Sequence, residues 1–121
     1  MKKFLLILVS TMLLIACKSK KNTAGAVATD NANLVLSFYS KGSGIDTQAK
    51  KDYFEYQEIF EKNNAIKLTT TRNAWGREGE VDYKIDLTQL SAKQRKKFTS
   101  GLKNKLKDKQ VHFKEEASQS K

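Results

Sequence analysis

The stretch AIKLTTTRNAWGREGEVDYKIDL, residues 65–87, contains two runs in which every second side chain is apolar or β-branched, separated by a segment with two glycines. The alternating side chains are Ile66, Leu68 and Thr70 in the first run, and Val81, Tyr83, Ile85 and Leu87 in the second. Such alternation is typical of a strand that buries one face. Two such runs around a glycine-containing segment predict a hairpin. We therefore expect strands over residues 65–72 and 80–87, joined by NAWGREG at residues 73–79.

A further strand is predicted upstream of the hairpin. NLVLSFY, residues 33–39, is rich in residues that favour strands and is fairly apolar on both faces, which favours a central position in a sheet. Gly42 and Gly44 follow it and are expected to turn the chain.

A helix is predicted next, over residues 47–62. Asp46 or Thr47 is suited to cap its N-terminus, and Asn63 and Asn64 are expected to end it. The side chains Ala49, Tyr53, Tyr56 and Phe60 fall on one stripe of this helix, with Ile59 at the border.

The segment after the hairpin predicts a second helix and a last strand. Ser91 and Gln94, in SAKQ, have the spacing of a capping box. Phe98, Leu102 and Leu106 follow at helical spacing. Gly101 lies inside this helix, where glycine costs about 1 kcal/mol relative to alanine and is tolerable where close packing needs it. QVHF, residues 110–113, is expected to form a short strand.

The resulting order βαββαβ predicts an α+β fold, a small antiparallel sheet with two helices on one face, in the ferredoxin-like arrangement. The other sheet face is then partly open. Its expected members are Val35, Ser37, Tyr39, Lys67, Thr69, Thr71, Asp82, Lys84 and Asp86. A rival arrangement packs the hairpin on two helices, with the first strand merely beside it.

The N-terminal segment has the layout of an export signal: two lysines precede Phe4–Ile15, which is apolar except for two hydroxyl residues. This run is shorter than the roughly 20 residues that span a bilayer as a helix. Leu14-Ile15-Ala16-Cys17 resembles a bacterial lipobox. The resemblance implies cleavage before Cys17, a diacylglycerol on its thiol, and an acyl chain such as palmitate on the new amino terminus. Two or more chains give stable anchoring.

Four segments follow from these patterns. They are a signal peptide at residues 1–16, the lipidated cysteine and a flexible polar tether at 17–32, one small α+β domain at 33–114, and a polar tail at 115–121. Cys17 is the only cysteine, so the mature domain has no internal disulfide and no thiolate metal site.

The whole chain resembles small uncharacterised lipoproteins of Gram-negative bacteria, on its lipobox, its polar linker, and the segments FYSKGSGID and WGREGEVDY. The resemblance implies a lipid-anchored protein of the cell envelope and brings no activity with it. Lys18 follows Cys17, in place of the aspartate that resembles an inner-membrane retention signal in some bacteria. We therefore expect attachment to the outer membrane, facing the periplasm.

The candidate interaction residues are Trp75, Arg72, Arg77 and Tyr39. Tryptophan and arginine are enriched at binding hot spots, and three of these residues lie in or beside the hairpin connection. The alternative for Trp75 is that it folds back and caps the end of the core.

No catalytic constellation, metal site or cofactor site is predicted. Glu78 and Glu80 lack a partner for acid-base chemistry, and His112 is the only histidine. Gly42-Ser43-Gly44 before a helix has the ingredients of an anion cradle, but a sharp turn needs glycines as well. The first hypothesis is a non-catalytic module that binds an envelope protein or an anionic envelope polymer. The alternative, a protease inhibitor or small enzyme of the envelope, depends on fold analogy alone.

The second helix is strongly basic. Its basic residues are Lys93, Arg95, Lys96, Lys97, Lys103, Lys105, Lys107 and Lys109, against Asp108. Whether this is a solvated surface or a face for an anionic partner stays open. Nucleic acid is not an expected partner, because the aromatic and glycine pattern of an RNA-binding sheet is missing.

Overall fold

The computed structural model describes residues 32–117; the expected signal peptide, Cys17 and most of the tether lie outside the described residues. The elements are β1 (Asn33–Phe38), α1 (Thr47–Asn64), β2 (Thr69–Ala74), β3 (Val81–Asp86), α2 (Ala92–Lys105) and β4 (Val111–Glu116). The strands form one sheet in the order β2-β3-β1-β4, and every neighbouring pair is antiparallel. The ferredoxin-like α+β fold is therefore confirmed.

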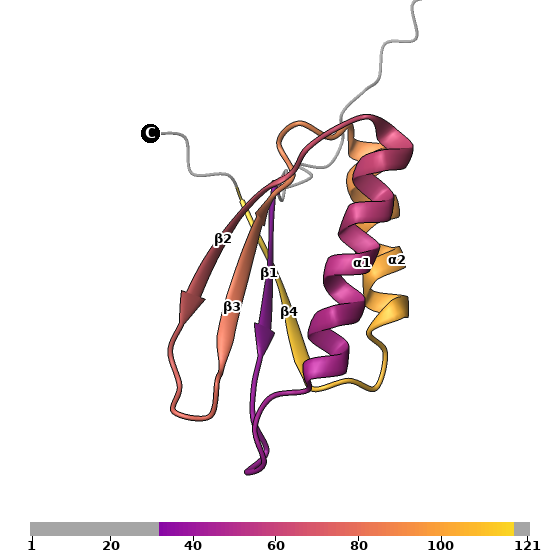
Figure 1. The fold of residues 1–121 in the computed structure, drawn as a ribbon. Helices are drawn as coiled ribbons and strands as arrows, with labels where there is room; N and C mark the ends of the chain where they lie inside the picture. Colours follow the sequence, from indigo (N-terminus) through magenta and orange to yellow (C-terminus); the bar gives the residue numbers. More distant parts are fainter. Residues whose placement is uncertain (1–31, 118–121) are drawn as a thin grey trace, which may run out of the picture.

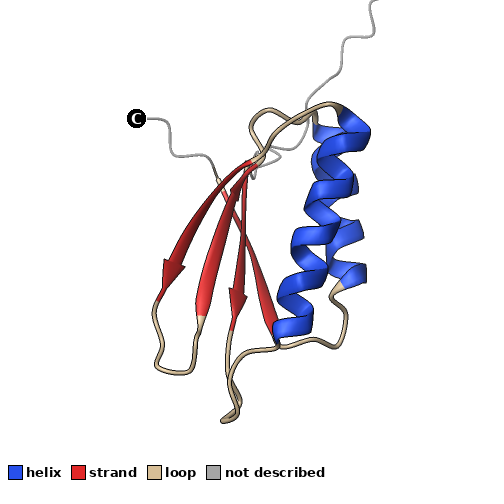
Figure 2. Ribbon diagram, in the orientation of Figure 1, coloured by secondary structure: helices blue, strands red, loops and turns tan. Residues whose placement is uncertain are grey.

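The two helices cover one face of the sheet and leave the other face uncovered, as Figures 1 and 2 show. β1 pairs with β3 on one side and with β4 on the other, so it is a central strand as predicted. The rival arrangement, with the first strand merely beside a hairpin, is wrong for the same reason.

The core lies between the sheet and the helices. Along β1 and β3 the side chains alternate between buried and partly exposed, as the sequence pattern predicts. Tyr53 of α1 is buried against the rings of Phe38 and Tyr83, with centroids 6.2 and 5.4 Å away. The remaining core side chains include Leu34, Leu36, Val81, Ile85, Phe60, Phe98, Leu102 and Leu106. Helix periodicity and strand alternation therefore converge on one apolar layer.

Both helix starts are capped as predicted. The Asp46 carboxylate accepts a hydrogen bond from the Ala49 amide at 2.8 Å, so Asp46 is the cap of α1. At α2, the Ser91 hydroxyl accepts from the Gln94 amide at 3.2 Å, and the Gln94 side chain accepts from the Ser91 amide at 3.0 Å. The capping box at Ser91 is confirmed.

The predicted end of α1 is two residues too early. The helix continues through Asn63 and Asn64, and Ala65 adopts the left-handed conformation, with φ 51°. Asn64 is held inside the helix because its side chain donates to the Phe60 carbonyl at 2.8 Å and accepts from Gln94 at 3.4 Å. These contacts outweigh the preference for asparagine at the left-handed position.

Gly101 has the packing reason that a glycine inside a helix requires. A Cβ atom at this position would lie 2.1 Å from the Tyr56 hydroxyl oxygen. That hydroxyl donates to the Phe98 carbonyl of α2 at 3.3 Å. The absence of a side chain at Gly101 thus lets α1 pack closely on α2.

β2 and β4 differ from the predicted bounds by two or more residues at an end, whereas β1 and β3 differ by only one residue at an end. β2 begins at Thr69 and reaches Ala74, so residues 65–68 are a connection and not part of the strand. Lys67, expected on the open sheet face, instead contacts Glu61 of α1. β4 runs from Val111 to Glu116, three residues beyond the predicted strand and two residues into the expected polar tail.

Candidate interaction surface

The open sheet face carries mainly polar side chains. The register places Asp82, Lys84 and Asp86 of β3 beside Ser37, Val35 and Asn33 of β1. Thr69, Thr71 and Asn73 of β2 continue these rows on one side, and His112, Lys114 and Glu116 of β4 continue them on the other. All the expected members within the strands are therefore found on this face, and the prediction missed the contribution of β4.

Trp75 lies directly after β2 and is held on this open face. Its indole N–H donates to the Asp82 carboxylate at 2.8 Å, and its backbone amide donates to the Glu80 carbonyl at 3.1 Å. The side chain is nevertheless 53% exposed. The alternative that Trp75 folds back to cap the core is wrong, because Asp82 belongs to the face opposite the core.

Tyr39 lies directly after β1 and is stacked on His112 of β4. The two rings are 4.4 Å apart between centroids and nearly parallel, at 8°. The Lys41 ammonium group lies 5.9 Å from the centroid of the Tyr39 ring, within reach of a cation-π interaction. Alternation within the predicted strand at residues 110–113 is enough to put His112 on the face opposite Val111 and Phe113, but its stacking partner follows only from the β1–β4 register.

These aromatic side chains share one end of the open face. Asp82 and His112 are both register partners of Ser37, one on each side of it. Neighbouring strands are about 4.8 Å apart, so the backbones of Asp82 and His112 are separated by roughly 10 Å. Trp75 is bonded to Asp82 and Tyr39 is stacked on His112. We name Trp75, Asp82, Ser37, His112 and Tyr39 the Trp75–Tyr39 surface.

The two loops at this end are fastened to each other. The Ser40 hydroxyl donates to the Glu78 carboxylate in the β2–β3 connection. The same hydroxyl oxygen accepts from the Gly42 amide at 2.9 Å and from the Gly44 amide at 3.0 Å. The glycine segment therefore forms a turn around Ser40. The amides of Gly42 and Gly44 are engaged within the chain, which argues against the anion cradle.

The structure divides the four candidate interaction residues. Trp75 and Tyr39 lie on the same face and at the same end. Arg72 pairs in register with the buried Tyr83, so it belongs to the helix side of edge strand β2. Arg77 lies in the exposed β2–β3 connection. Arg72 and Trp75 are close in sequence but serve opposite sides of the sheet.

Charges on the open face are largely balanced. The Glu116 carboxylate forms ion pairs with the ammonium groups of Lys84, at 3.1 Å, and of Lys114, at 2.8 Å. Hydrogen bonds from Lys114 and Lys84 lower the pKa of Glu116, and hydrogen bonds from Thr88 lower the pKa of Asp86. These groups are solvent-accessible, so their ion pairs contribute little to stability.

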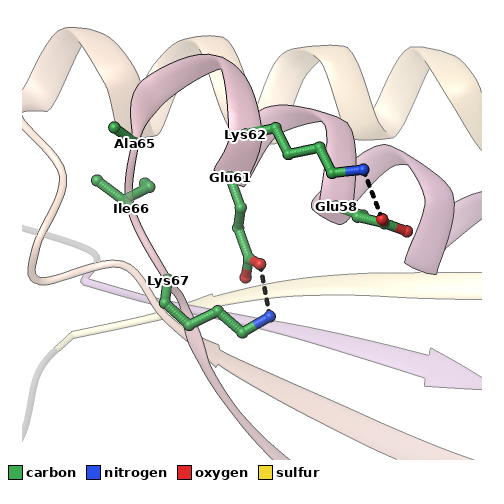
Figure 3. Close-up of a pocket in the computed structure, with 6 residues that line it drawn as sticks. All are labelled: Glu58, Glu61, Lys62, Ala65, Ile66 and Lys67. Atoms are coloured by element: carbon green, nitrogen blue, oxygen red, sulfur yellow. Dashed lines mark hydrogen bonds and ion pairs between the residues drawn. The ribbon is translucent and has the colours of Figure 1, made fainter.

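A surface pocket of about 520 Å³ lies at the end of α1, between the helix and the connection to β2. Figure 3 shows that its charged groups face one another: Glu61 with Lys67, and Glu58 with Lys62. The Glu61 carboxylate, 6% exposed as a residue, accepts from Lys67 at 2.8 Å, from Gln57 at 2.9 Å and from the Leu68 amide at 3.0 Å. Burial raises the pKa of Glu61, but these hydrogen bonds outweigh it and the net pKa is lowered.

The role of Glu61 is therefore to fasten the connection to the helix. Its two oxygens already have three donors, so the carboxylate has little capacity left for a ligand.

Comparisons with protein-family models, with curated proteins and with solved structures returned no significant match for this chain. Between residues 32 and 117, no cluster of three or more His, Cys, Asp or Glu side chains is placed to bind a metal ion. None of the helices in this same part of the chain combines the length and the apolar character needed to cross a membrane.

Proposed function

We propose that this protein is a lipid-anchored lipoprotein of the bacterial cell envelope, attached through Cys17, and that its folded domain is a non-catalytic binding module. The Trp75–Tyr39 surface is the part that contacts the partner, which is another envelope protein. The outer membrane, on its periplasmic side, is the proposed location.

The observation that carries this proposal is that Trp75 is exposed on the open sheet face and is held there by a hydrogen bond. A large apolar side chain that is half exposed usually loses mobility when a partner covers it, which opposes binding. The hydrogen bond from the indole N–H to Asp82 already holds Trp75 in place. A preorganised tryptophan beside polar groups has the character of an interface hot spot.

The surroundings of Trp75 support a rigid surface. The stack of Tyr39 on His112 and the hydrogen bond between Ser40 and Glu78 tie together segments from β1, β4 and the hairpin connection. An aromatic pair with polar groups between its members resembles the mixed composition of protein interfaces. Charge balance on the open face favours a protein partner over a polyanion.

Partner capture tests the role of the surface. The lipidated protein is purified from membranes with its cross-linked partners, in wild-type form and as Trp75→Ala. Ile59→Ala is the matched control, because Ile59 is an exposed apolar side chain of α1, 51% exposed, and does not lie on the sheet. We expect Trp75→Ala to lose the partner and Ile59→Ala to keep it. Equal capture by both variants would remove Trp75 from the proposal.

Mass spectrometry of the mature N-terminal peptide tests the anchor. The expected peptide begins at Cys17 and carries the mass of a diacylglycerol and an acyl chain, and Cys17→Ser abolishes both processing and membrane association. Recovery of wild-type protein with a free Cys17 thiol, in a fraction without membranes, would contradict the anchoring.

A further inference from the structure

The first two turns of α2 carry an unfavourable arrangement of charge. Lys93, Arg95, Lys96 and Lys97 lie near the start of the helix, and the first turn holds no acidic residue. The N-terminus of a helix is the positive end of its dipole, where cations are destabilising. Lys93 also stands three residues before Lys96 and four before Lys97, at spacings where like charges repel.

Within residues 32–117, Lys93, Lys96 and Lys97 have no ion-pair partner that would relieve the repulsion. All three are exposed. We name these three residues the α2 lysine cluster. Its arrangement weakens the helix, so helix stability does not account for it.

The position of the cluster relates it to the anchor. Figure 1 shows that α2 begins at the end of the molecule where β1 begins, so the cluster lies at the end from which the chain leads back toward Cys17. The Trp75–Tyr39 surface lies at the opposite end, on the sheet face that the helices do not cover. The cluster and the proposed partner surface are therefore separated by the length of the sheet.

We propose that the α2 lysine cluster binds the anionic surface of the membrane to which the protein is anchored. This inference depends on the anchoring at Cys17 given under the proposed function. The contact turns the Trp75–Tyr39 surface away from the bilayer and toward the aqueous compartment. The lipid chains supply the attachment, and the lysines supply the orientation.

Charge and distance favour a membrane over a soluble polyanion as the occupant. Each lysine close to an anionic bilayer increases the affinity of a protein for that bilayer about fivefold, so three lysines together increase it roughly one hundredfold. A tethered domain meets the membrane at high effective concentration, whereas a soluble polymer has no such advantage.

Lysine labelling of the full lipidated protein on vesicles tests the contact. The protein is bound to phosphatidylcholine vesicles, with or without phosphatidylglycerol, and treated with a water-soluble amine reagent. We expect the α2 lysine cluster to react at least several-fold more slowly when phosphatidylglycerol is present. Lys41 lies in the connection after β1 and Lys51 lies near the start of α1, and both are exposed. Figure 1 shows that α1 begins at the end opposite the start of α2, so these two lysines should react equally on both kinds of vesicle. Equal labelling of the cluster on both vesicles would overturn the inference.

The two proposals fail in different ways in this experiment. Failure to bind phosphatidylcholine vesicles at all would contradict the lipid anchor. Binding without protection of the cluster would contradict only the second contact. Protection of the cluster by a soluble polyanion, but not by anionic vesicles, would overturn the membrane as occupant.

Charge reversal separates a local contact from overall charge. In the double variant Lys96→Glu, Lys97→Glu, the remaining Lys93 should lose its protection on anionic vesicles. The matched variant Lys41→Glu, Lys51→Glu changes the net charge equally at the far end and should retain protection of the α2 lysine cluster. Trp75 is the only tryptophan, so the tryptophan fluorescence of the protein reports on this side chain alone. Because the proposed orientation holds Trp75 away from the bilayer, brominated lipids should not quench this fluorescence in the wild type. Strong quenching would place Trp75 against the bilayer and overturn the orientation.

Discussion

Glu61 shows how one buried carboxylate determines the course of a connection. It holds Lys67 and the Leu68 amide against α1, and Leu68 thereby enters the core without joining the β2 ladder. Sequence alternation through Ile66 and Leu68 indicated a strand here. The alternation correctly predicted that Leu68 is buried. It wrongly predicted a strand, because the Leu68 amide donates its hydrogen bond to the Glu61 side chain and not to a neighbouring strand.

Replacing Glu61 with glutamine should change the acid sensitivity of the fold. The pKa of Glu61 is lowered in the folded protein, so its contribution to stability is present above the ordinary pKa and is lost as pH falls through the folded value. Glu61→Gln should cost about 1–2 kcal/mol near neutral pH and progressively less on acidification. Urea unfolding at several pH values measures both effects.

Glu58→Gln is the matched control for this prediction. Glu58 pairs with Lys62 on the exposed side of the same helix, where an ion pair contributes little. We expect no measurable change in the free energy of unfolding. An unchanged difference between wild type and Glu61→Gln from neutral to acid pH would contradict the assigned role of Glu61.

Gly101 and Tyr56 should behave as a coupled pair. In the wild-type background, Gly101→Ala should lower the free energy of unfolding by about 1–2 kcal/mol, because the added methyl group displaces the Tyr56 ring. In a Tyr56→Ala background the same substitution should raise it by about 1 kcal/mol, the helix propensity of alanine over glycine. A double-mutant cycle by urea unfolding measures both. The same sign in both backgrounds would refute the packing explanation.

At the level of elements, both helix starts could be predicted from local sequence, whereas the strand bounds could not. Asp46 and Ser91 act on amides within three residues, so their chemistry is visible in a short window. β4 reaches Glu116 because its residues pair with β1 along its whole length. KEE, residues 114–116, has little strand propensity of its own. Pairing with a central strand, which is remote in sequence, overrides that preference.

The unfavourable charge at the start of α2 makes a prediction about stability. Lys93→Glu should raise the free energy of unfolding by roughly 0.5–1 kcal/mol, because it replaces a cation near the positive end of the helix dipole by an anion. Lys105→Glu, in the last turn of α2, should lower it by a similar amount, because it places an anion near the negative end. Thermal and urea unfolding measure both variants. A destabilising Lys93→Glu would show that Lys93 has a structural role.

At the scale of the whole molecule, the ferredoxin-like order could be predicted because each element has a clear period and the connections are short. The assembly of the Trp75–Tyr39 surface could not. Trp75 and Tyr39 were predicted as separate candidates, and only the register joins them through Asp82, Ser37 and His112. Arg72 lies three residues before Trp75. Because successive side chains of a strand point to opposite faces, an odd separation puts Arg72 on the other face of the sheet.

The resulting molecule has two functional ends in this account. The end where β1 and α2 begin carries the α2 lysine cluster and leads to the proposed anchor. The end where β1 and β2 finish carries the Trp75–Tyr39 surface. The sheet between them is about 20 Å long, as six-residue strands require. Membrane contact and partner contact are thus assigned to surfaces that do not compete.

Site-specific photo-crosslinking in living cells tests the central claim most directly. A photoreactive amino acid is placed at position 73 in one variant of the lipidated protein and at position 59 in another. Asn73 is exposed on the open face beside Asp82, and Ile59 is exposed on α1, so both variants keep Trp75. We expect a discrete protein adduct from position 73 and none from position 59. No adduct from position 73, or the same adduct from both positions, would contradict the claim that the Trp75–Tyr39 surface binds the partner.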